Sequence, residues 1–114
     1  MDLVVQESDR GGWAVVRASG DLDLTTAPRL RERVVKVVTS GQPHVVLDLQ
    51  QVDFVDSTGL GVLVGLLKRT RSQGGDLKLV STRLSLQKVL ELTSLDQALP
   101  LARTVDEALS ETAG

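Results

Sequence analysis

The feature that most constrains the fold is a nearly continuous apolar run at residues 44–49, which read HVVLDL. A run of this length is typical of a strand with both faces buried, as in parallel sheets that carry helices on each face. A second apolar run at residues 77–80 predicts another strand. Between the two runs, apolar residues recur with helical spacing at Leu60, Leu63, Val64 and Leu67. A strand, a helix and a strand in this order indicate a right-handed parallel unit, and therefore an α/β fold.

The remaining segments supply further elements around this unit. Strands at residues 3–8 and 13–18 are predicted to form a hairpin, because Gly11 and Gly12 tolerate the positive φ of a tight turn. Helices are predicted at residues 27–38, 58–73, 83–92 and 104–109, and a short edge strand within residues 95–102. The candidate helix caps are Thr25 or Thr26 for the first helix and Thr82 for the third. We expect a single domain over residues 1–114, with a mixed β-sheet of four to five strands and helices packed against it.

The composition narrows the classes of function. The chain has 114 residues, a net charge of −2 and 2% aromatic residues, so it lacks the basic surface and the aromatic platforms expected of a nucleic-acid-binding protein. It contains no cysteine, which excludes disulfides and thiolate chemistry and fits a reducing compartment. No signal peptide is visible, and no apolar run approaches the roughly 18 residues that span a bilayer. We expect a cytoplasmic protein that binds neither nucleic acid nor membrane.

Candidate catalytic and metal-binding groups are sparse. His44 is the single histidine, and it stands at the edge of the apolar run, as a loop residue, without a nucleophile motif for which it could act as a base. Gly59 and Gly61 hint at a phosphate-binding loop, but Val64 replaces the third small residue of the dinucleotide fingerprint. The sequence contains no ligand set with the spacing that a metal ion requires. We expect no enzymatic activity, no cofactor and no metal.

The most informative motif is DSTGLG at residues 56–61, at the predicted junction between the buried strand and the following helix. Ser57 stands at the helix start, where backbone N–H groups lack intrahelical partners and the helix dipole is positive. Its hydroxyl either caps the helix or is a site that another protein recognises and modifies. The acidic Asp56 adjoins the hydroxyl, and Gly59 and Gly61 are expected to leave it uncovered.

Two further features bear on the same region. Asp21 and Asp23 form a short acidic stretch after the second strand, and they either shape a turn or add negative charge near Ser57. Gly61 and Gly65 lie one turn apart on a second face of the helix, which suggests that something packs closely there. The packing partner is either an element of the same fold or another protein.

Three segments together resemble the STAS domain, and more narrowly the bacterial anti-sigma factor antagonists. The segments are residues 20–23 (GDLD), 45–49 (VVLDL) and 54–63 (FVDSTGLGVL), which match in order and spacing. The resemblance extends over essentially the whole chain. It implies a mixed β-sheet with helices packed against it.

The resemblance also implies partner switching. In this family the unmodified antagonist binds an anti-sigma factor, often a serine kinase, and thereby frees a sigma factor. The kinase phosphorylates the serine that corresponds to Ser57, the complex dissociates, and a serine phosphatase reverses the modification. The residues expected to bind the partner are Asp21, Asp23, Asp56, Ser57, Thr58, Gly59, Leu60 and Gly61.

Two alternatives remain. The chain could be a STAS-domain subunit of another assembly, of the stressosome or lipid-transport type, which binds its partner constitutively and uses Ser57 only as a cap. A small α/β enzyme is the other class, and the missing acid, base and metal groups disfavour it. We expect a monomer or a weak dimer.

Overall fold

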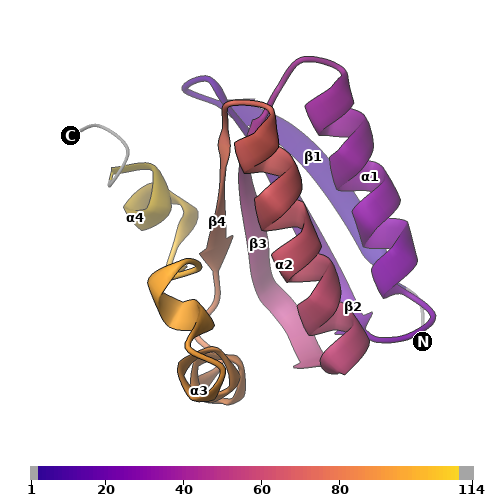
Figure 1. Cartoon of the computed structure of the whole chain (residues 1–114), viewed down its shortest axis with the longest axis vertical. Helices are drawn as coiled ribbons and strands as arrows, with labels where there is room; N and C mark the ends of the chain where they lie inside the picture. Colours follow the sequence, from indigo (N-terminus) through magenta and orange to yellow (C-terminus); the bar gives the residue numbers. More distant parts are fainter. Residues whose placement is uncertain (1–2, 111–114) are drawn as a thin grey trace.

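The computed structural model describes residues 3–110, which form a five-stranded sheet with helices on both faces (Figure 1). The strands are β1 (Val4–Arg10), β2 (Trp13–Leu22), β3 (His44–Val55), β4 (Asp76–Val80) and β5 (Leu101–Ala102). Their order in the sheet follows their order in the sequence. β1 pairs antiparallel with β2, and the other neighbouring strands are parallel. The predicted α/β class and mixed sheet are confirmed.

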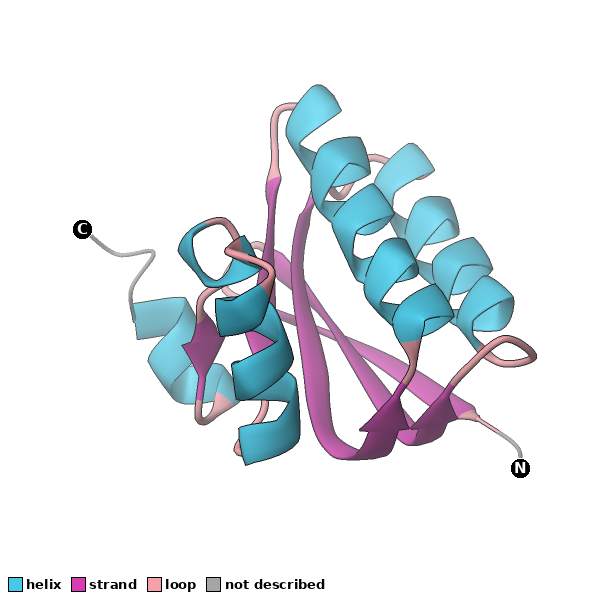
Figure 2. Ribbon diagram, turned by 60° about the horizontal axis from the view of Figure 1, so that its bottom comes forward, coloured by secondary structure: helices cyan, strands magenta, loops and turns pink. Residues whose placement is uncertain are grey.

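The helices are α1 (Ala27–Thr39), α2 (Ser57–Ser72), α3 (Leu84–Leu92) and α4 (Val105–Ser110), with a short 3₁₀ helix, η1 (Leu95–Gln97). α1 and α2 lie side by side across one face of the sheet (Figures 1 and 2), and their buried side chains share the main core with those of α3. α4 packs on the opposite face, in a smaller cluster of Val15, Val46, Val80, Ala102, Val105 and Ala108. No helix within residues 3–110 is long and apolar enough to cross a membrane.

β3 is the central strand, as the apolar run predicts. Its residues 45–49 are all buried. Leu47 and Leu49 belong to the main core, whereas Val46 belongs to the cluster under α4. Side chains alternate between the two faces of a strand, so both faces of this strand are covered.

β2 and β3 are both longer than predicted, and the added residues bring two loops together. β2 continues to Leu22 and β3 to Val55, and these two residues are partners in the parallel register. The register shifts between Gly20 and Asp21, and Gly20 has a φ of 120°, which a residue with a side chain rarely adopts. Both strands therefore end at the same edge of the sheet, next to each other.

Three local predictions differ from the structure. His44 is the first residue of β3 rather than a loop residue, and its ring lies 5.0 Å from that of Trp13. Thr26 occupies the cap position of α1, but its hydroxyl donates to the carbonyl of Asp21 at 2.6 Å instead of capping the helix. Thr82 does not cap α3, because the cap position falls on Arg83, and no side chain makes a cap hydrogen bond there.

Candidate functional site

The junction between β3 and α2 is organised by Asp56. This residue has an extended backbone with φ −90° and ψ −175°, and α2 begins directly after it. Its Oδ1 atom accepts the backbone N–H of Gly59 at 2.8 Å, which is the geometry of a helix N-cap. The interpretation of Ser57 as the helix cap is therefore wrong, because the helix starts one residue earlier than predicted and the cap position falls on Asp56.

Ser57 is the first residue of α2, and its side chain is exposed. Within residues 3–110, its hydroxyl has no hydrogen-bond partner. The hydroxyl thus lies at the positive end of a 16-residue helix, and because it is exposed, an enzyme can reach it.

Asp56 also holds the loop between β2 and α1. Its Oδ2 atom accepts the N–H of Leu24 at 3.1 Å, and its own N–H donates to the carbonyl of Leu22, also at 3.1 Å. One carboxylate therefore joins two segments that are far apart in the sequence. The position of the loop relative to Ser57 depends on this carboxylate.

Asp23 folds the same loop from within. Its carboxylate accepts the N–H of Thr25 at 2.9 Å, the hydroxyl of Thr25 at 2.8 Å and the N–H of Thr26 at 3.1 Å. The hydrogen bond from the Thr25 hydroxyl, followed by those from the backbone, lowers the pKa of Asp23. The interpretation of Asp23 as a turn residue is confirmed. Asp21 is half-buried at the end of β2, and its carbonyl accepts the hydroxyl of Thr26.

Gly59 has a different role from the one predicted. It is buried, and a Cβ atom at this position would lie 2.7 Å from the carbonyl oxygen of Leu22 and 3.0 Å from side-chain atoms of Leu22 and Val55. Gly59 therefore permits the close approach of α2 to the end of β2. The expectation that it leaves the Ser57 hydroxyl uncovered is wrong, because the side on which Gly59 lacks a side chain faces Leu22 and Val55.

Gly61 and Gly65 face open space. Apart from the adjoining residues and the backbone of α2 itself, no atom of residues 3–110 lies within 4 Å of a Cβ atom built on either residue, and both are exposed. Of the two alternatives left open for these glycines, close packing by an element of the same fold is therefore wrong. This face of α2 is free to contact a partner.

The eight predicted partner-binding residues lie together around the β3–α2 junction, with unequal exposure. Ser57 and Gly61 are exposed, and Gly59 is buried. The half-buried members are Asp21, Asp23, Asp56, Thr58 and Leu60. Leu60 packs against the main core, so its side chain supports the helix more than it offers a contact surface.

Sequence reasoning missed two exposed apolar residues at this junction. Leu24 in the β2–α1 loop is 71% exposed, and Phe54 near the end of β3 is 54% exposed. Phe54 pairs in register with Asp21, and Leu24 is bonded to Asp56. The one available signal was that Phe54 is one of only two aromatic residues in the chain.

Within residues 3–110, no three acidic, histidine or cysteine side chains are grouped in a way that could hold a metal ion. The arrangement instead offers an accessible hydroxyl, acidic side chains and exposed apolar side chains on one edge. Exposed apolar side chains gathered in one place are typical of surfaces that contact other proteins.

Comparison with known proteins assigns the chain to a family. A family model described as "STAS domain" matches residues 2–108. The chain belongs to the STAS domain family. This STAS domain is 30% identical over 112 residues to the anti-sigma F factor antagonist of Paenibacillus polymyxa, covering 97% of this chain and 96% of that protein. It is 36% identical over 87 residues to the anti-sigma-B factor antagonist of Bacillus subtilis, covering 76% and 79% of the two chains.

A solved structure shares the same fold. The crystal structure of an anti-sigma factor antagonist from Mycobacterium paratuberculosis superposes on this STAS domain with a TM-score of 0.88 and 31% sequence identity. The superposition covers 98% of this chain and 95% of that one. The STAS resemblance and the expected STAS architecture are therefore confirmed.

Proposed function

We propose that this STAS domain is an anti-sigma factor antagonist that is switched by phosphorylation of Ser57. In its unmodified form it binds an anti-sigma factor with serine kinase activity, and a sigma factor is released. Phosphorylation of Ser57 ends the binding, and a serine phosphatase restores it. The observation that carries the proposal is the exposed, unbonded hydroxyl of Ser57 at the start of α2. The names of the two relatives support the antagonist role.

The charges around the junction explain why a phosphate would act as a switch. Phosphorylation adds about −1.5 to −2 charges at one point. Asp21, Asp23 and Asp56 lie at the same edge, so the new charge is added beside three acidic side chains. A partner adapted to the unmodified surface would meet added bulk, and binding would have to remove this concentrated charge from water. A loss of about 2.8 kcal/mol of binding free energy weakens affinity roughly a hundredfold, so a moderate penalty suffices.

In this proposal the protein is a binding regulator and not an enzyme. Ser57 accepts a group from the partner and does not act as a nucleophile on a small substrate. The single histidine, His44, lies at the start of β3 beside Trp13. Ser57 follows the opposite end of that strand, so His44 cannot act as its base. The proposal places the protein in the cytoplasm, where sigma factors act.

The test is a binding experiment with phosphorylation as the variable. Unmodified protein is used to capture its partner from the source cells, and the captured protein is identified and purified. We expect a protein kinase that acts as an anti-sigma factor, and we expect it to transfer phosphate to Ser57 of the parent and not to the Ser57→Ala variant. The Ser57→Asp variant should bind at least about tenfold more weakly, which corresponds to about 1.4 kcal/mol.

A matched control separates charge at the site from charge in general. Ser72→Asp adds the same charge on the same helix, at its opposite end. This variant should bind like the parent. Equal binding by Ser57→Asp and the parent would contradict the charge mechanism. Absence of phosphate on Ser57 in source cells under all growth conditions would favour the constitutive STAS-domain subunit instead.

A further inference from the structure

An apolar groove lies between the end of β3 and helix α3. Its volume is about 220 Å³, and its apolar lining includes Val52, Phe54, Leu86 and Val89. Asp53 and Arg83 stand at its rim and form an ion pair with 2.5 Å between Oδ1 and Nη2. Within residues 3–110 no element fills this groove, and the proposed switch does not use it.

The groove lies next to the junction that carries Ser57. Phe54 precedes Ser57 by three residues, and Val55 belongs to the groove lining. Figures 1 and 2 both place the end of β3, the start of α2 and the helix α3 at one end of the molecule. A protein that binds over Ser57 could therefore contact the groove as well, because no other element within residues 3–110 lies between them.

Exposed apolar side chains are concentrated at this end. The large hydrophobic residues that are exposed within residues 3–110 are Val4, Leu24, Phe54, Leu84, Val89 and Leu92. Of these, only Val4 lies away from the β2–α1 loop, the end of β3 and α3. Val89 is 38% exposed, and Leu92 continues its side of α3 one turn further along. Leu84 lines a separate hollow on the other side of α3, whereas Phe54 and Val89 line the groove. Exposed apolar side chains gathered in one place indicate a protein interaction site.

The size and charge of the groove indicate what occupies it. Pockets for small-molecule ligands usually measure about 300–1,000 Å³, so a volume of about 220 Å³ suits one or two protein side chains better. The acidic Asp21, Asp23 and Asp56 lie at the same end and favour a partner with basic residues nearby. Binding hot spots usually lie in such pockets, where a partner's side chain is buried and the surrounding contacts exclude water.

We infer that this groove receives an apolar side chain of the anti-sigma factor, so that the docking surface runs from Ser57 over Phe54 to Val89 of α3. This inference rests on the proposed function. It adds a second anchor that phosphorylation does not modify. In this arrangement the groove would supply most of the binding free energy, and phosphorylation of Ser57 would control whether the complex forms.

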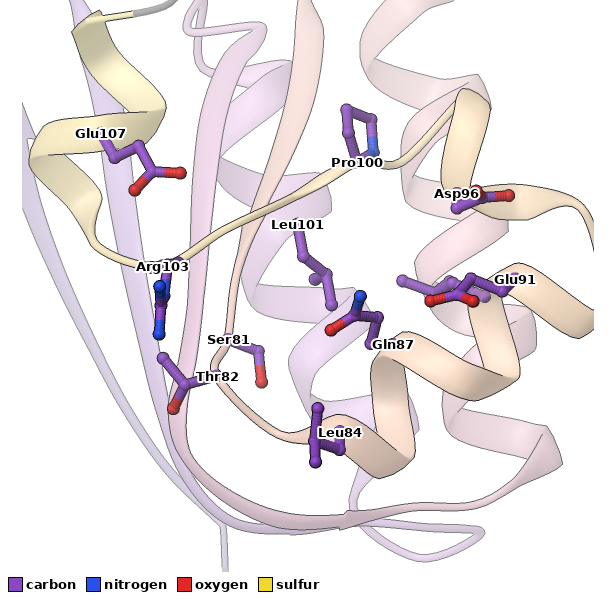
Figure 3. Close-up of a pocket in the computed structure, with 11 residues that line it drawn as sticks. Ser81, Thr82, Leu84, Gln87, Glu91, Asp96, Pro100, Leu101, Arg103 and Glu107 are labelled. Atoms are coloured by element: carbon purple, nitrogen blue, oxygen red, sulfur yellow. The ribbon is translucent and has the colours of Figure 1, made fainter.

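The opposite side of α3 provides a control. There, Gln87 and Glu91 face a larger hollow of about 610 Å³, which Arg103 lines from the loop after β5 and Glu107 from α4 (Figure 3). Gln87 and Val89 are two positions apart on a helix, so their side chains point in nearly opposite directions. Both are exposed.

The absence of cysteine in the chain permits a direct footprint. Val89→Cys and Gln87→Cys each introduce a single thiol on the same helix. The labelling rate with a maleimide is measured for each variant, alone and with a saturating amount of the anti-sigma factor captured by the parent. We expect labelling of Val89→Cys to slow at least tenfold in the complex, and that of Gln87→Cys to stay within twofold.

A second pair of variants measures affinity. Val89→Asp places a charge in the groove and should weaken binding of the anti-sigma factor at least tenfold, whereas Gln87→Asp should bind like the parent. Circular dichroism and thermal melting establish that each variant is folded. A Val89→Cys variant that reacts equally fast in the complex would overturn the inference.

The outcomes also separate this inference from the proposed function. If the parent binds the anti-sigma factor and Val89 is unprotected, only the groove assignment fails. If the parent binds no anti-sigma factor, both fail. If labelling of Val89→Cys slows with rising concentration of the protein alone, a second copy of this chain occupies the groove, and the inference is wrong.

Discussion

The carboxylate of Asp56 accepts the backbone N–H of Leu24 at 3.1 Å, across a separation of 32 residues in the sequence. Its other oxygen accepts the N–H of Gly59 and caps α2. A single side chain thereby sets both the start of the helix that carries Ser57 and the position of the loop beside it. The geometry of the candidate switch depends on a residue that is not itself modified.

Removing the carboxylate of Asp56 should lower the free energy of unfolding. Asp56→Ala removes the helix cap and leaves the N–H of Leu24 without its acceptor, so we expect a loss of about 1–2 kcal/mol in the free energy of unfolding. Urea denaturation measures this change. Asp53→Ala is the control, because its ion pair with Arg83 is exposed and should contribute less than about 1 kcal/mol. Equal stability of the two variants would contradict the role of Asp56 as cap.

Removing the hydroxyl of Ser57 should abolish phosphorylation without destabilising the fold. Ser57 does not cap α2 and its side chain is exposed, so Ser57→Ala should change the free energy of unfolding by less than about 0.5 kcal/mol. Thermal melting of the purified variant checks this expectation. A loss above 1 kcal/mol would mean that the hydroxyl has a structural role after all.

The three glycines of α2 should respond to alanine in opposite ways. Gly59→Ala brings a Cβ atom within 2.7 Å of the Leu22 carbonyl, and neither backbone can move freely, so we expect a loss of about 1–3 kcal/mol. Gly61→Ala and Gly65→Ala meet no atom within 4 Å and should stabilise the helix by about 0.5–1 kcal/mol. Denaturation of the three variants under one condition measures the contrast.

The same alanine variants test whether the open face of α2 contacts the partner. If the anti-sigma factor packs closely on this face, Gly61→Ala should weaken binding although it stabilises the free protein. Gly65→Ala, one turn further from Ser57, should weaken it less. Unchanged affinity for both would restrict the docking surface to the helix start and the groove beside α3.

The lowered pKa of Asp23 predicts a pH dependence of stability. Because the folded state holds this carboxylate below its ordinary pKa of 3.8, the ionised form stabilises the fold. That contribution is fully present above pH 3.8 and is lost as the pH falls through the folded-state pKa. The parent should therefore exceed Asp23→Asn in stability at pH 7, and the difference should shrink below pH 4. Urea denaturation at both pH values measures it, and a constant difference would contradict the assignment.

Several features followed from the sequence because they depend on contacts within one element. The apolar run at residues 44–49 identified the central strand, and helical spacing from Leu60 to Leu67 identified α2. The order of strand, helix and strand then led to the α/β class. The motif at residues 56–61 placed Ser57 at the helix start and pointed to the STAS family.

The caps and the glycines required the tertiary structure. Whether Asp56 or Ser57 caps α2 depends on the backbone angles at the junction and on the N–H of Leu24, which comes from a distant loop. Gly59 and Gly61 look equivalent in the sequence, yet the end of β2 approaches only Gly59. The residue pattern of a helix does not indicate which backbone segment of another element packs against it.

The sequence by itself determined most of the elements, their order, and the place of Ser57 near the start of α2. The packing of β2 beside β3 decided the rest. It aligned Leu22 with Val55, brought the β2–α1 loop against Asp56, and left Leu24 and Phe54 exposed beside Ser57. The physical reason is that periodicity records which face of a segment is apolar, whereas the exposure of a residue at a strand end depends on the neighbours that the register places beside it.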